Sequence, residues 1–326
     1  MGGHGRRGRF ERGRRHCAAP HAPFAGPEQL RSRARTCHNR THQEDAMTPT
    51  RQTATWAVDT LGAVIGRRQL VRAARFALHR ARLDVPNDPN RNGEYALQRW
   101  MLDATRPDAP ITVLDVGANV GAWSQSLLRQ AALTGRLERL RLHAFEPAGH
   151  THQLLSERIG EQAQVNRLAV SDLCGTATLH VVAPGAGTNS LHGDLVAPMS
   201  TEKVETTTVD AYIRNQNIKH VDLIKVDTEG HDFAVLSGCL RTLQTRAVSL
   251  VQFEYNHRWI QARQYLKDAF ELLEPLGYRI GKLTPRGMEP YLGWDPDLET
   301  FVEGNYLAAT PETANRLPQV AWWKPR

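Results

Sequence analysis

The chain has 326 residues and an ordinary hydrophobic content of 40%, which allows one large α/β domain with extensions. No stretch approaches the roughly 20 uninterrupted apolar residues of a membrane span, so the sequence predicts no transmembrane segment. Residues 1–46 hold ten arginines against four acids, or +6 of the net +7, and leave only +1 for the rest. This distribution argues against a basic groove for nucleic acid in the folded part.

The first segment is rich in Gly, Arg, His and Pro and lacks apolar periodicity, so we expect a disordered basic extension over residues 1–53. Ordinary composition begins near Met47, which favours residues 1–46 as an upstream extension over an RNA-binding arm. No export signal is visible in this segment. The cysteines lack metal or disulfide spacing, and we therefore expect a cytoplasmic protein; they are Cys17, Cys37, Cys174 and Cys239.

Apolar residues at helical spacing between Ala54 and Leu83 predict one or two arginine-rich amphipathic helices. Such a helix can lie on a membrane surface, but packing on the domain edge or over the active site is the commoner use. A linker is expected over residues 84–92 and a short helix over Tyr95–Leu102. Together these elements make a helical segment over residues 54–104.

From Ile111 onwards, short apolar runs alternate with helical patterns, which is typical of βαβ units around a parallel sheet. The sequence therefore predicts an α/β domain over residues 105–326, with a doubly wound, mostly parallel, seven-stranded sheet. A β-rich insertion is expected over 176–208. The expected strands are 111–116, 140–146, 164–170, 221–227, 248–254, 277–281 and 304–309, and the expected helices are 121–131, 149–158, 231–243 and 262–274.

The run from Val113 to Gly121 combines a buried strand, a glycine-rich turn and a helix start. Gly117 and Gly121 let the backbone approach a ligand without an intervening Cβ atom. Ligands of doubly wound sheets bind at the carboxyl ends of the strands, near the switch in strand order. The motif therefore indicates a nucleotide-like cofactor.

The charge beside this turn indicates which nucleotide-like cofactor binds. Dinucleotide sites place a pyrophosphate on G-x-G-x-x-G, whereas this turn reads G-x-N-x-G with Asn119 at its centre and Asp115 before it. An acid there would repel phosphate but suits the ammonium group of S-adenosylmethionine (SAM). The alternative is that Asp115 only stabilises the turn.

The second strand ends in Phe145-Glu146-Pro147, beside the first turn. A carboxylate at Glu146 can accept both hydroxyls of an adenosine ribose. Dinucleotide enzymes use a related acid, and an acid is also favoured near the start of a helix, so Glu146 alone does not discriminate. Its spacing from the turn supports a SAM site.

With these motifs the sequence resembles the FkbM family of methyltransferases, over about residues 111–281. The segment Ile224–Asp232, IKVDTEGHD, is the most family-specific, although His231-Asp232 replaces a more usual apolar residue and Glu. The other matching segments are Leu114–Gly121, Phe145–Pro147, Asn166–Asp172 and Thr188–Leu191.

The resemblance implies a class I Rossmann-like methyltransferase fold, SAM as donor, and O-methylation of a sugar, glycan or polyketide-type hydroxyl. The acceptor is then a small molecule or saccharide rather than nucleic acid, and the family's diversity leaves it unnamed. Ser171 and Asp172 follow the third strand, where class I enzymes contact adenine, and the family match carries this assignment.

Four ionisable residues end or follow the fourth strand, at the same edge as the SAM motif: Lys225, Asp227, Glu229 and His231. Methyl transfer to an alcohol needs a positioned acceptor and removal of its proton. We expect Asp227 or His231 to act as base and Glu229 to orient it. The alternative is a Lys225–Glu229 ion pair with Asp232 capping the next helix.

Oxygen ligands at the fourth and fifth strand tips also make Mg²⁺ conceivable, through Asp227, Glu254 and Asn256, without a commitment to a metal site. The loop 184–191 is expected either to close over the acceptor or simply to connect. Three rivals remain: a nucleic-acid methyltransferase, disfavoured by D-T-E-G after the fourth strand; a nucleotide-dependent oxidoreductase, disfavoured by the glycine spacing; and a catalytically weak SAM-binding scaffold.

Overall fold

A computed structural model describes residues 49–106, 108–182, 189–191 and 198–321. The expectations for residues 1–48, and for 184–188 of the predicted closing loop, lie outside these ranges. The chain divides into two compact units, residues 1–67 and 68–326, with the division inside the helical segment expected over 54–104.

In the first unit, helix α1 (Pro49–Ile65) begins within the segment expected to be disordered and ends before Gly66. Gly66 has a φ of +87°, a conformation that glycine adopts readily and other residues rarely do. The arginine-rich pattern that continues beyond it therefore forms a separate helix, α2 (Arg67–Ala81). Of the two arrangements left open by the sequence, the chain adopts two helices.

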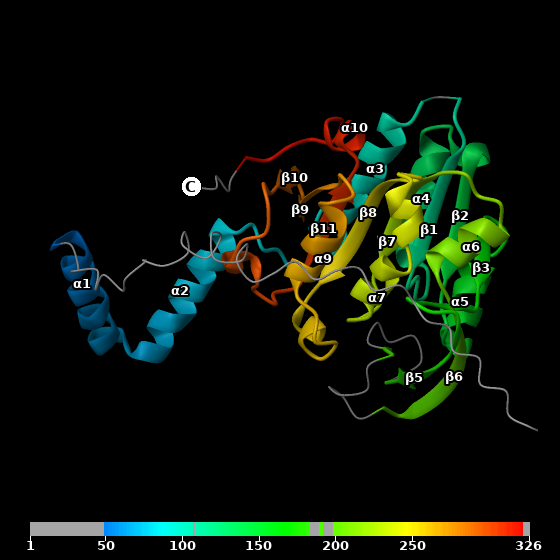
Figure 1. Ribbon diagram of the computed structural model, residues 1–326. Coiled ribbons are helices and arrows are strands. Elements are labelled where there is room, and N and C mark those ends of the chain that lie inside the picture. Colours follow the sequence, from blue (N-terminus) through cyan, green and yellow to red (C-terminus); the bar gives the residue numbers. More distant parts are fainter. Residues whose placement is uncertain (1–48, 107, 183–188, 192–197, 322–326) are drawn as a thin grey trace, which may run out of the picture. The chain divides into compact units, whose positions relative to one another are not determined.

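The second unit contains the predicted doubly wound sheet (Figure 1), in the order β10-β9-β11-β8-β7-β1-β2-β3. Strand β1 pairs in parallel with β2 and β7, and β11 pairs antiparallel with β8 and β9. Seven of the strands are the predicted core of a class I Rossmann-like fold. The strands are β1 (Ile111–Val116), β2 (Leu140–Phe145), β3 (Gln164–Asn166), β7 (Val221–Val226), β8 (Val248–Tyr255), β9 (Arg279–Thr284), β10 (Gly287–Pro290) and β11 (Gly304–Ala309).

The eighth strand, β10, corrects the predicted count of seven. It has only four residues and pairs with β9 across the short turn at Pro285-Arg286. A run this short carries no apolar pattern that would mark it in the sequence. The strand extends the sheet at the edge far from β1.

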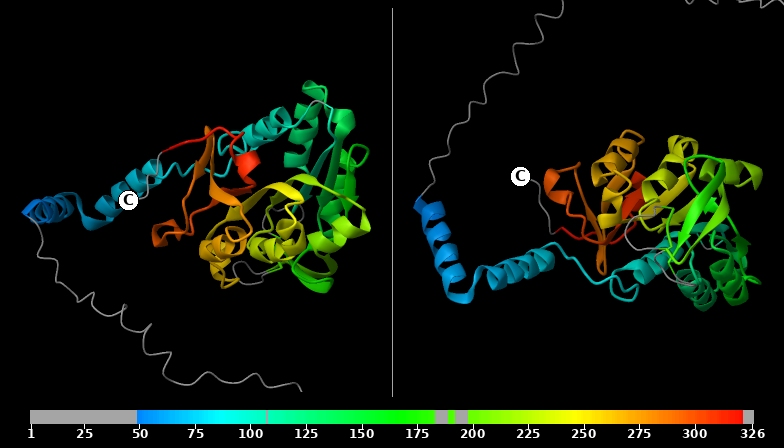
Figure 2. Two further views of the ribbon diagram at one scale, coloured as in Figure 1. Left: turned by 45° about the horizontal axis from the view of Figure 1, so that its top comes forward. Right: turned by 90° about the horizontal axis from the view of Figure 1, so that it is seen from below.

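Helices cover both faces of the sheet (Figures 1 and 2) and bury two separate clusters of apolar side chains. Alternation along β1 sends Leu114 and Val116 into one cluster and Ile111 and Val113 into the other. The second cluster also receives side chains from helices α3 and α4. The helices of this unit after α2 are α3 (Glu94–Ala104), α4 (Ala122–Leu133), α5 (Gly149–Ile159), α6 (Val209–Asn215), α7 (Asp232–Ser237), α8 (Leu240–Gln244), α9 (Leu266–Leu273) and α10 (Pro311–Ala314).

Two predicted elements are divided. The helix expected over 231–243 breaks into α7 and α8 around Gly238, whose backbone lies so close to the third strand's end that a Cβ atom there would be 2.1 Å from the Ser171 carbonyl oxygen. The strand expected over 164–170 breaks into β3 and β4 (Ala169–Val170), which belong to different sheets. The helix α6 was not predicted.

The β-rich insertion forms a second sheet of three strands, in the order β4-β6-β5. Strands β5 (Gly175–Val181) and β6 (Ser200–Thr207) pair antiparallel and lie beyond one end of the main sheet, at the bottom of Figure 1. A small apolar cluster holds this sheet; its buried members are Ala148, Ala169, Leu179 and Val204. The insertion thus has a core of its own.

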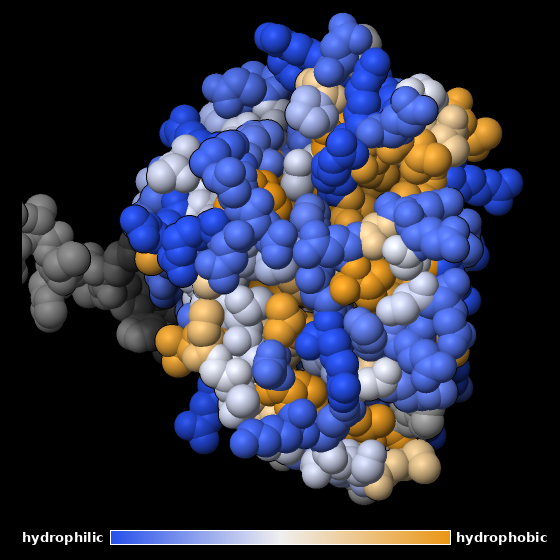
Figure 3. Space-filling model, turned by 90° about the vertical axis from the view of Figure 1, so that its right-hand side faces the viewer, coloured by the Kyte–Doolittle hydropathy of each residue, from blue (hydrophilic) through white to orange (hydrophobic). Residues whose placement is uncertain are grey.

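The surface that faces the viewer in Figure 3 is largely hydrophilic, with smaller apolar patches between the polar side chains. Such a mixture is ordinary for a protein surface. Within the described part of the chain, every helix is too short or too polar to cross a bilayer.

Candidate functional site

A cavity of about 230 Å³ lies at the carboxyl ends of β1, β2 and β7. The chain runs outward from β1 to β3 and then returns to the other side of β1 through β7, so the cavity sits at the switch in strand order. Its wall is completed by the insertion and by the linker before α3. The lining residues are Asn87, Val116, Gly117, Asn119, Phe145, Glu146, Pro147, Leu168, Ala169, Val170, Leu179, Asn189, Ser190, Leu191, Asp227, Thr228, Glu229 and His231.

The first turn packs directly against the tip of β7. The Asp227 N–H donates to the Val116 carbonyl at 3.0 Å, and a Cβ atom on Gly117 would lie 1.9 Å from the Asp227 carbonyl oxygen. Gly117 has a φ of +79°, Asn119 a φ of +48° and Gly121 a φ of +81°, so the turn uses positive-φ backbone three times. Gly117 therefore permits a contact that any side chain would prevent.

The two predicted turn glycines have different environments. Gly121 does not line the cavity, because it precedes α4 and faces α5, where an added Cβ atom would lie 2.7 Å from the Leu155 side chain. Gly121 thus allows α4 and α5 to pack closely. Of the turn residues 117–121, Gly117 and Asn119 reach the cavity wall.

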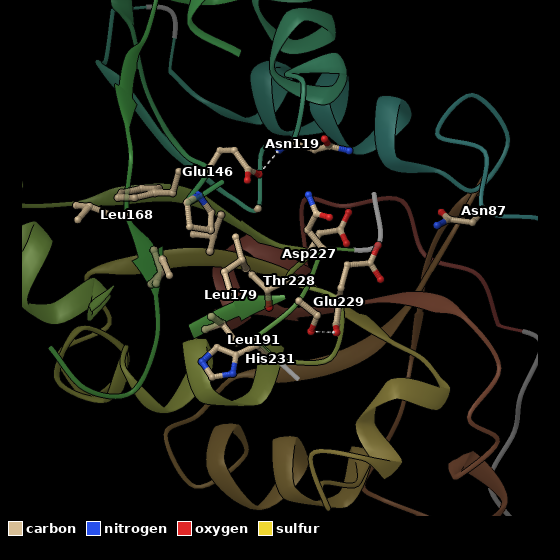
Figure 4. A pocket seen from close by; sticks show the side chains of 18 residues that line it. Asn87, Asn119, Glu146, Leu168, Leu179, Leu191, Asp227, Thr228, Glu229 and His231 are labelled. Carbon is tan, nitrogen blue, oxygen red and sulfur yellow. Dashed lines mark hydrogen bonds between the residues drawn. The ribbon is translucent and has the colours of Figure 1, made fainter. Parts of the chain in front are cut away.

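Glu146 lines the cavity with a buried side chain that is held by the backbone on either side (Figure 4). One carboxylate oxygen accepts the Asn119 N–H at 3.1 Å and the other accepts the Ala148 N–H at 2.9 Å. Burial raises the pKa of Glu146 to about 7, against the lowering effect of these two hydrogen bonds. Each oxygen keeps a lone pair for a ligand hydroxyl.

Asp115 lies outside the cavity. It occupies the same face of β1 as Val113, and it is fully buried against α4, where it accepts the Ser124 hydroxyl at 2.6 Å. Its other oxygen lies 3.6 Å from the Lys225 ammonium. Burial raises the pKa of Asp115, while Lys225 opposes the rise. This geometry favours the alternative in which Asp115 stabilises the turn.

Lys225 is also buried and lies behind the cavity wall. It pairs with Asp115 in the register of β1 and β7, and its ammonium is 3.0 Å from an Asp227 carboxylate oxygen. Burial alone would lower the pKa of Lys225, but the carboxylates of Asp227, Asp115 and Glu94 raise it. Lys225 therefore supplies the buried cation that balances these acids.

The alternative interpretation, an ion pair between Lys225 and Glu229, is wrong. Glu229 has a φ of +58° and forms its ion pair with Arg258, because the chain leaves the strand geometry after Asp227. Asp232 does not cap α7 either; its carboxylate accepts the Thr228 and Gly230 N–H groups at 3.2 and 3.1 Å. Asp232 therefore fixes the turn that carries the cavity residues.

The structure brings Asp227, Glu229 and His231 together at the cavity, as predicted. In Figure 4, Asp227 and Thr228 lie between Glu146 on one side and His231 on the other. The Asp227 side chain keeps 33% of its surface exposed, although it pairs with Lys225. The His231 Nε2 atom lies 2.9 Å from the Ser171 hydroxyl.

Ser171 and Asp172 do not line the cavity; the neighbouring residues Leu168, Ala169 and Val170 do. The Ser171 hydroxyl donates to Asp172 at 2.9 Å and contacts His231, so it connects the end of β4 to the loop after β7. Residues 168–170 thus form an apolar wall of the cavity, and the flat ring of a ligand can pack against it.

Two side chains that sequence reasoning did not select also reach the cavity. Asn87 comes from the linker after α2 and Leu179 from β5, and neither carries a motif. The described end of the predicted closing loop lines the cavity as well: the Ser190 hydroxyl donates to the Glu229 carbonyl oxygen at 2.9 Å. Tertiary packing alone brings these segments together.

The residues proposed for Mg²⁺ do not form a metal site. Among the described residues, no group of three or more His, Cys, Asp and Glu side chains is placed to hold a metal ion. Glu254 is buried and accepts the Asn256 amide at 2.7 Å, and burial followed by the nearby Asp227 raises its pKa well above the ordinary value.

Three polar atoms in the cavity wall are buried and have no hydrogen-bond or ion-pair partner within the described residues: the Asn119 Oδ1, Asn189 Nδ2 and Thr228 Oγ1 atoms. Unpaired buried polar atoms are rare and call for a ligand or water. Together with the spare lone pairs of Glu146 and the space beside Gly117, they provide groups that a nucleoside with a polar tail would satisfy.

Comparison with known proteins gives one family match: a model of the Methyltransferase FkbM domain matches residues 115–280, about half of the chain. No curated protein matches. Among solved structures, the chain is similar to the DszA carbon methyltransferase, with 11% identity over 64% of this chain and 49% of that one and a TM-score of 0.37. It thus spans about half of that protein's length.

Two further structures are similar at the same level. For the bifunctional kinase-methyltransferase WbdD, identity is 14% over 69% of this chain and 40% of that one, with a TM-score of 0.39. For the precorrin-6y C5,15-methyltransferase from Geobacter metallireducens, identity is 10% over 66% of this chain and 88% of that one, with a TM-score of 0.34.

Proposed function

The chain belongs to the FkbM methyltransferase family, and we propose that it transfers a methyl group from SAM to a hydroxyl of a sugar, glycan or polyketide-type product. We further propose that residues 105–326 form the methyltransferase domain and residues 54–104 a helical segment that precedes it. The observation that carries the proposal is the buried Glu146 carboxylate in a cavity at the switch in strand order.

Glu146 fits the adenosine part of the donor. Its two oxygens are fixed by backbone N–H groups at 3.1 and 2.9 Å, so both can accept the vicinal hydroxyls of a ribose without moving. The apolar wall from Leu168 to Val170 offers a face for adenine. The family match placed Ser171 and Asp172 at adenine. We propose instead that they act indirectly, by holding this wall in place.

The methionine end of the donor then lies toward Gly117 and the tip of β7. Because Asp115 faces α4, Asp227 is the carboxylate that the cavity offers to an ammonium group there. The unpaired Asn119 Oδ1 atom is a further acceptor beside it. Asp227, rather than Asp115, is therefore the acid that would attract the ammonium group of SAM and repel the diphosphate of a dinucleotide.

SAM supplies an electrophilic methyl group on a sulfonium centre, so the protein has to position the acceptor oxygen and take its proton. Of the groups in the cavity able to accept that proton, we assign Asp227 and His231 as the candidate bases. The Glu229–Arg258 ion pair holds the turn between them. Lys225 touches neither ligand and acts as a positioning residue through Asp227.

The acceptor side of the cavity is polar. Asn87, Asn189 and Glu229 line it, and they present amide and carboxylate groups that match the hydroxyls of a sugar or polyol. This composition supports an oxygen acceptor. It gives little support to a flipped nucleobase, which requires aromatic side chains for stacking.

The proposal is tested with purified protein, methyl-labelled SAM and an extract of the producing cell, separated into small-molecule, saccharide and nucleic-acid fractions. We expect label in a small molecule or saccharide, and loss of that label with Asp227→Asn. Label confined to nucleic acid would contradict the acceptor class. Binding of S-adenosylhomocysteine (SAH) without label in any fraction would indicate the scaffold instead.

A further inference from the structure

Helix α2 has an unusual charge, because residues 47–326 carry a net charge of only +1 with its arginines included. Its 15 residues, RRQLVRAARFALHRA, contain five arginines and no acid. Among the described residues, none of these arginines forms an ion pair; the one charged contact of the helix joins His79 to Asp84 at 2.8 Å. The cationic charge of α2 is therefore uncompensated.

Three of the five arginines of α2 lie on one side of the helix, and Arg67 and Arg80 lie outside this group. At about 100° per residue, Arg68, Arg72 and Arg75 fall with His79 inside an arc of about 60°. A stripe of apolar side chains, interrupted at its start by Arg67, occupies an arc of about 160° on another side; it consists of Leu70, Val71, Ala73, Ala74, Ala77, Leu78 and Ala81. The helix is strongly amphipathic, with low overall hydrophobicity.

The apolar stripe is not covered within the described residues. Val71 is 49% exposed and Leu78 50% exposed, and Phe76, which lies outside the stripe, is 68% exposed. A helix that served only to pack on the domain would bury these side chains. The exposed stripe beside a row of arginines needs a partner that is apolar and anionic at once.

We propose that α2 docks this protein on an anionic lipid surface, with the apolar stripe among the acyl chains and the arginines at the phosphate headgroups. Helices of this kind, with a basic arc, an apolar stripe and low net hydrophobicity, lie in the plane of a bilayer interface. Arginine side chains are long enough to reach headgroups while the helix axis lies at the acyl boundary. The methyltransferase cavity then works beside a membrane.

Charge separates this partner from two others. A second copy of α2 would bring five more arginines against the first five, and like charges oppose that association. Nucleic acid would satisfy the arginines but leave Val71 and Leu78 in water. Only an anionic lipid surface matches both sides of the helix.

The test measures binding of the full chain to vesicles of 70% phosphatidylcholine and 30% phosphatidylglycerol by co-sedimentation, with pure phosphatidylcholine vesicles as reference. We expect binding to the anionic vesicles only, weakened by high salt. The variant Arg68→Gln/Arg72→Gln/Arg75→Gln should bind about 125-fold more weakly, because each of the three arginines near such a surface is worth about a fivefold gain. The variant Val71→Ser/Leu78→Ser should lose binding with its arginines intact.

The matched control removes three exposed arginines elsewhere, Arg129→Gln/Arg141→Gln/Arg214→Gln, and should bind like the parent. Equal losses in both triple variants would show attraction by net charge alone, including that of residues 1–46, and would overturn the proposal. Equal binding to neutral and anionic vesicles would also overturn it. So would a lipid-independent dimer, seen in sedimentation equilibrium, that Val71→Ser/Leu78→Ser dissociates. RNA binding without vesicle binding would overturn it as well.

Discussion

Replacing Glu146 by glutamine should remove most of the affinity for the SAM product, SAH. The carboxylate accepts two backbone N–H groups and, in the proposed complex, two ribose hydroxyls. A glutamine amide keeps one acceptor oxygen and turns an NH₂ donor toward a backbone donor. Two charge-assisted hydrogen bonds at about 1.5 kcal/mol each give a loss of about 3 kcal/mol, or roughly 150-fold in Kd.

The assay is isothermal titration calorimetry with SAH at pH 8, where the parent carboxyl is ionised because burial raises its pKa only to about 7. Glu161→Gln, an exposed Glu after α5, is the matched control and should bind SAH like the parent. The affinity of the parent should also fall as the pH drops through 7, while that of Glu146→Gln stays flat. Unchanged SAH affinity in Glu146→Gln, with the parent's pH profile, would refute the assignment of Glu146 to the ribose.

Three more predictions concern other groups of the site. Lys225→Met should cost about 3–5 kcal/mol of unfolding free energy in urea, because it leaves the fully buried Asp115 carboxylate unpaired, and Asp115→Asn in the same chain should recover part of the loss; a change below 1 kcal/mol would contradict the ion pair. Burial gives Glu146 and Asp232 pKa values of about 7, above their ordinary values, so the folded chain holds these protons to higher pH than the unfolded chain and unfolding free energy should fall between about pH 4.5 and 7. Asp232→Asn should flatten the fall of unfolding free energy with pH, and an identical slope in the variant would contradict the raised pKa of Asp232. His231→Gln should lower the methyl-transfer rate by at least 10²-fold with SAH affinity unchanged if His231 is the base; a rate in His231→Gln within tenfold of the parent's would exclude His231 and leave Asp227 as the base.

Burial explains which parts of the fold were predictable. Strands β1 and β11 run between the same residues as predicted, because each is a short, mostly apolar segment. Glu146 was placed correctly at the cavity because strand ends of a doubly wound sheet meet at one edge. In these cases a local pattern and a topological rule are sufficient.

The wrong predictions are those that required information that only tertiary packing supplies. Alternation places Asp115 and Val113 on the same face of β1, but the sequence does not say that α4 covers this face and supplies Ser124. The apolar spacing of 231–243 continues across Gly238, yet the close contact with the Ser171 carbonyl breaks the helix there. Asn87 reaches the cavity from a linker that shows only turn-forming residues.

The proposed donor site is tested most directly by which adenosine-containing ligand the cavity prefers. Calorimetric titration of the purified chain with SAH and, separately, with NADH measures this preference. The geometry around Glu146 and Asp227 predicts SAH binding in the micromolar range and no detectable heat from NADH, whose diphosphate would meet the Asp227 carboxylate. Tight binding of NADH with no affinity for SAH would contradict the proposed donor site.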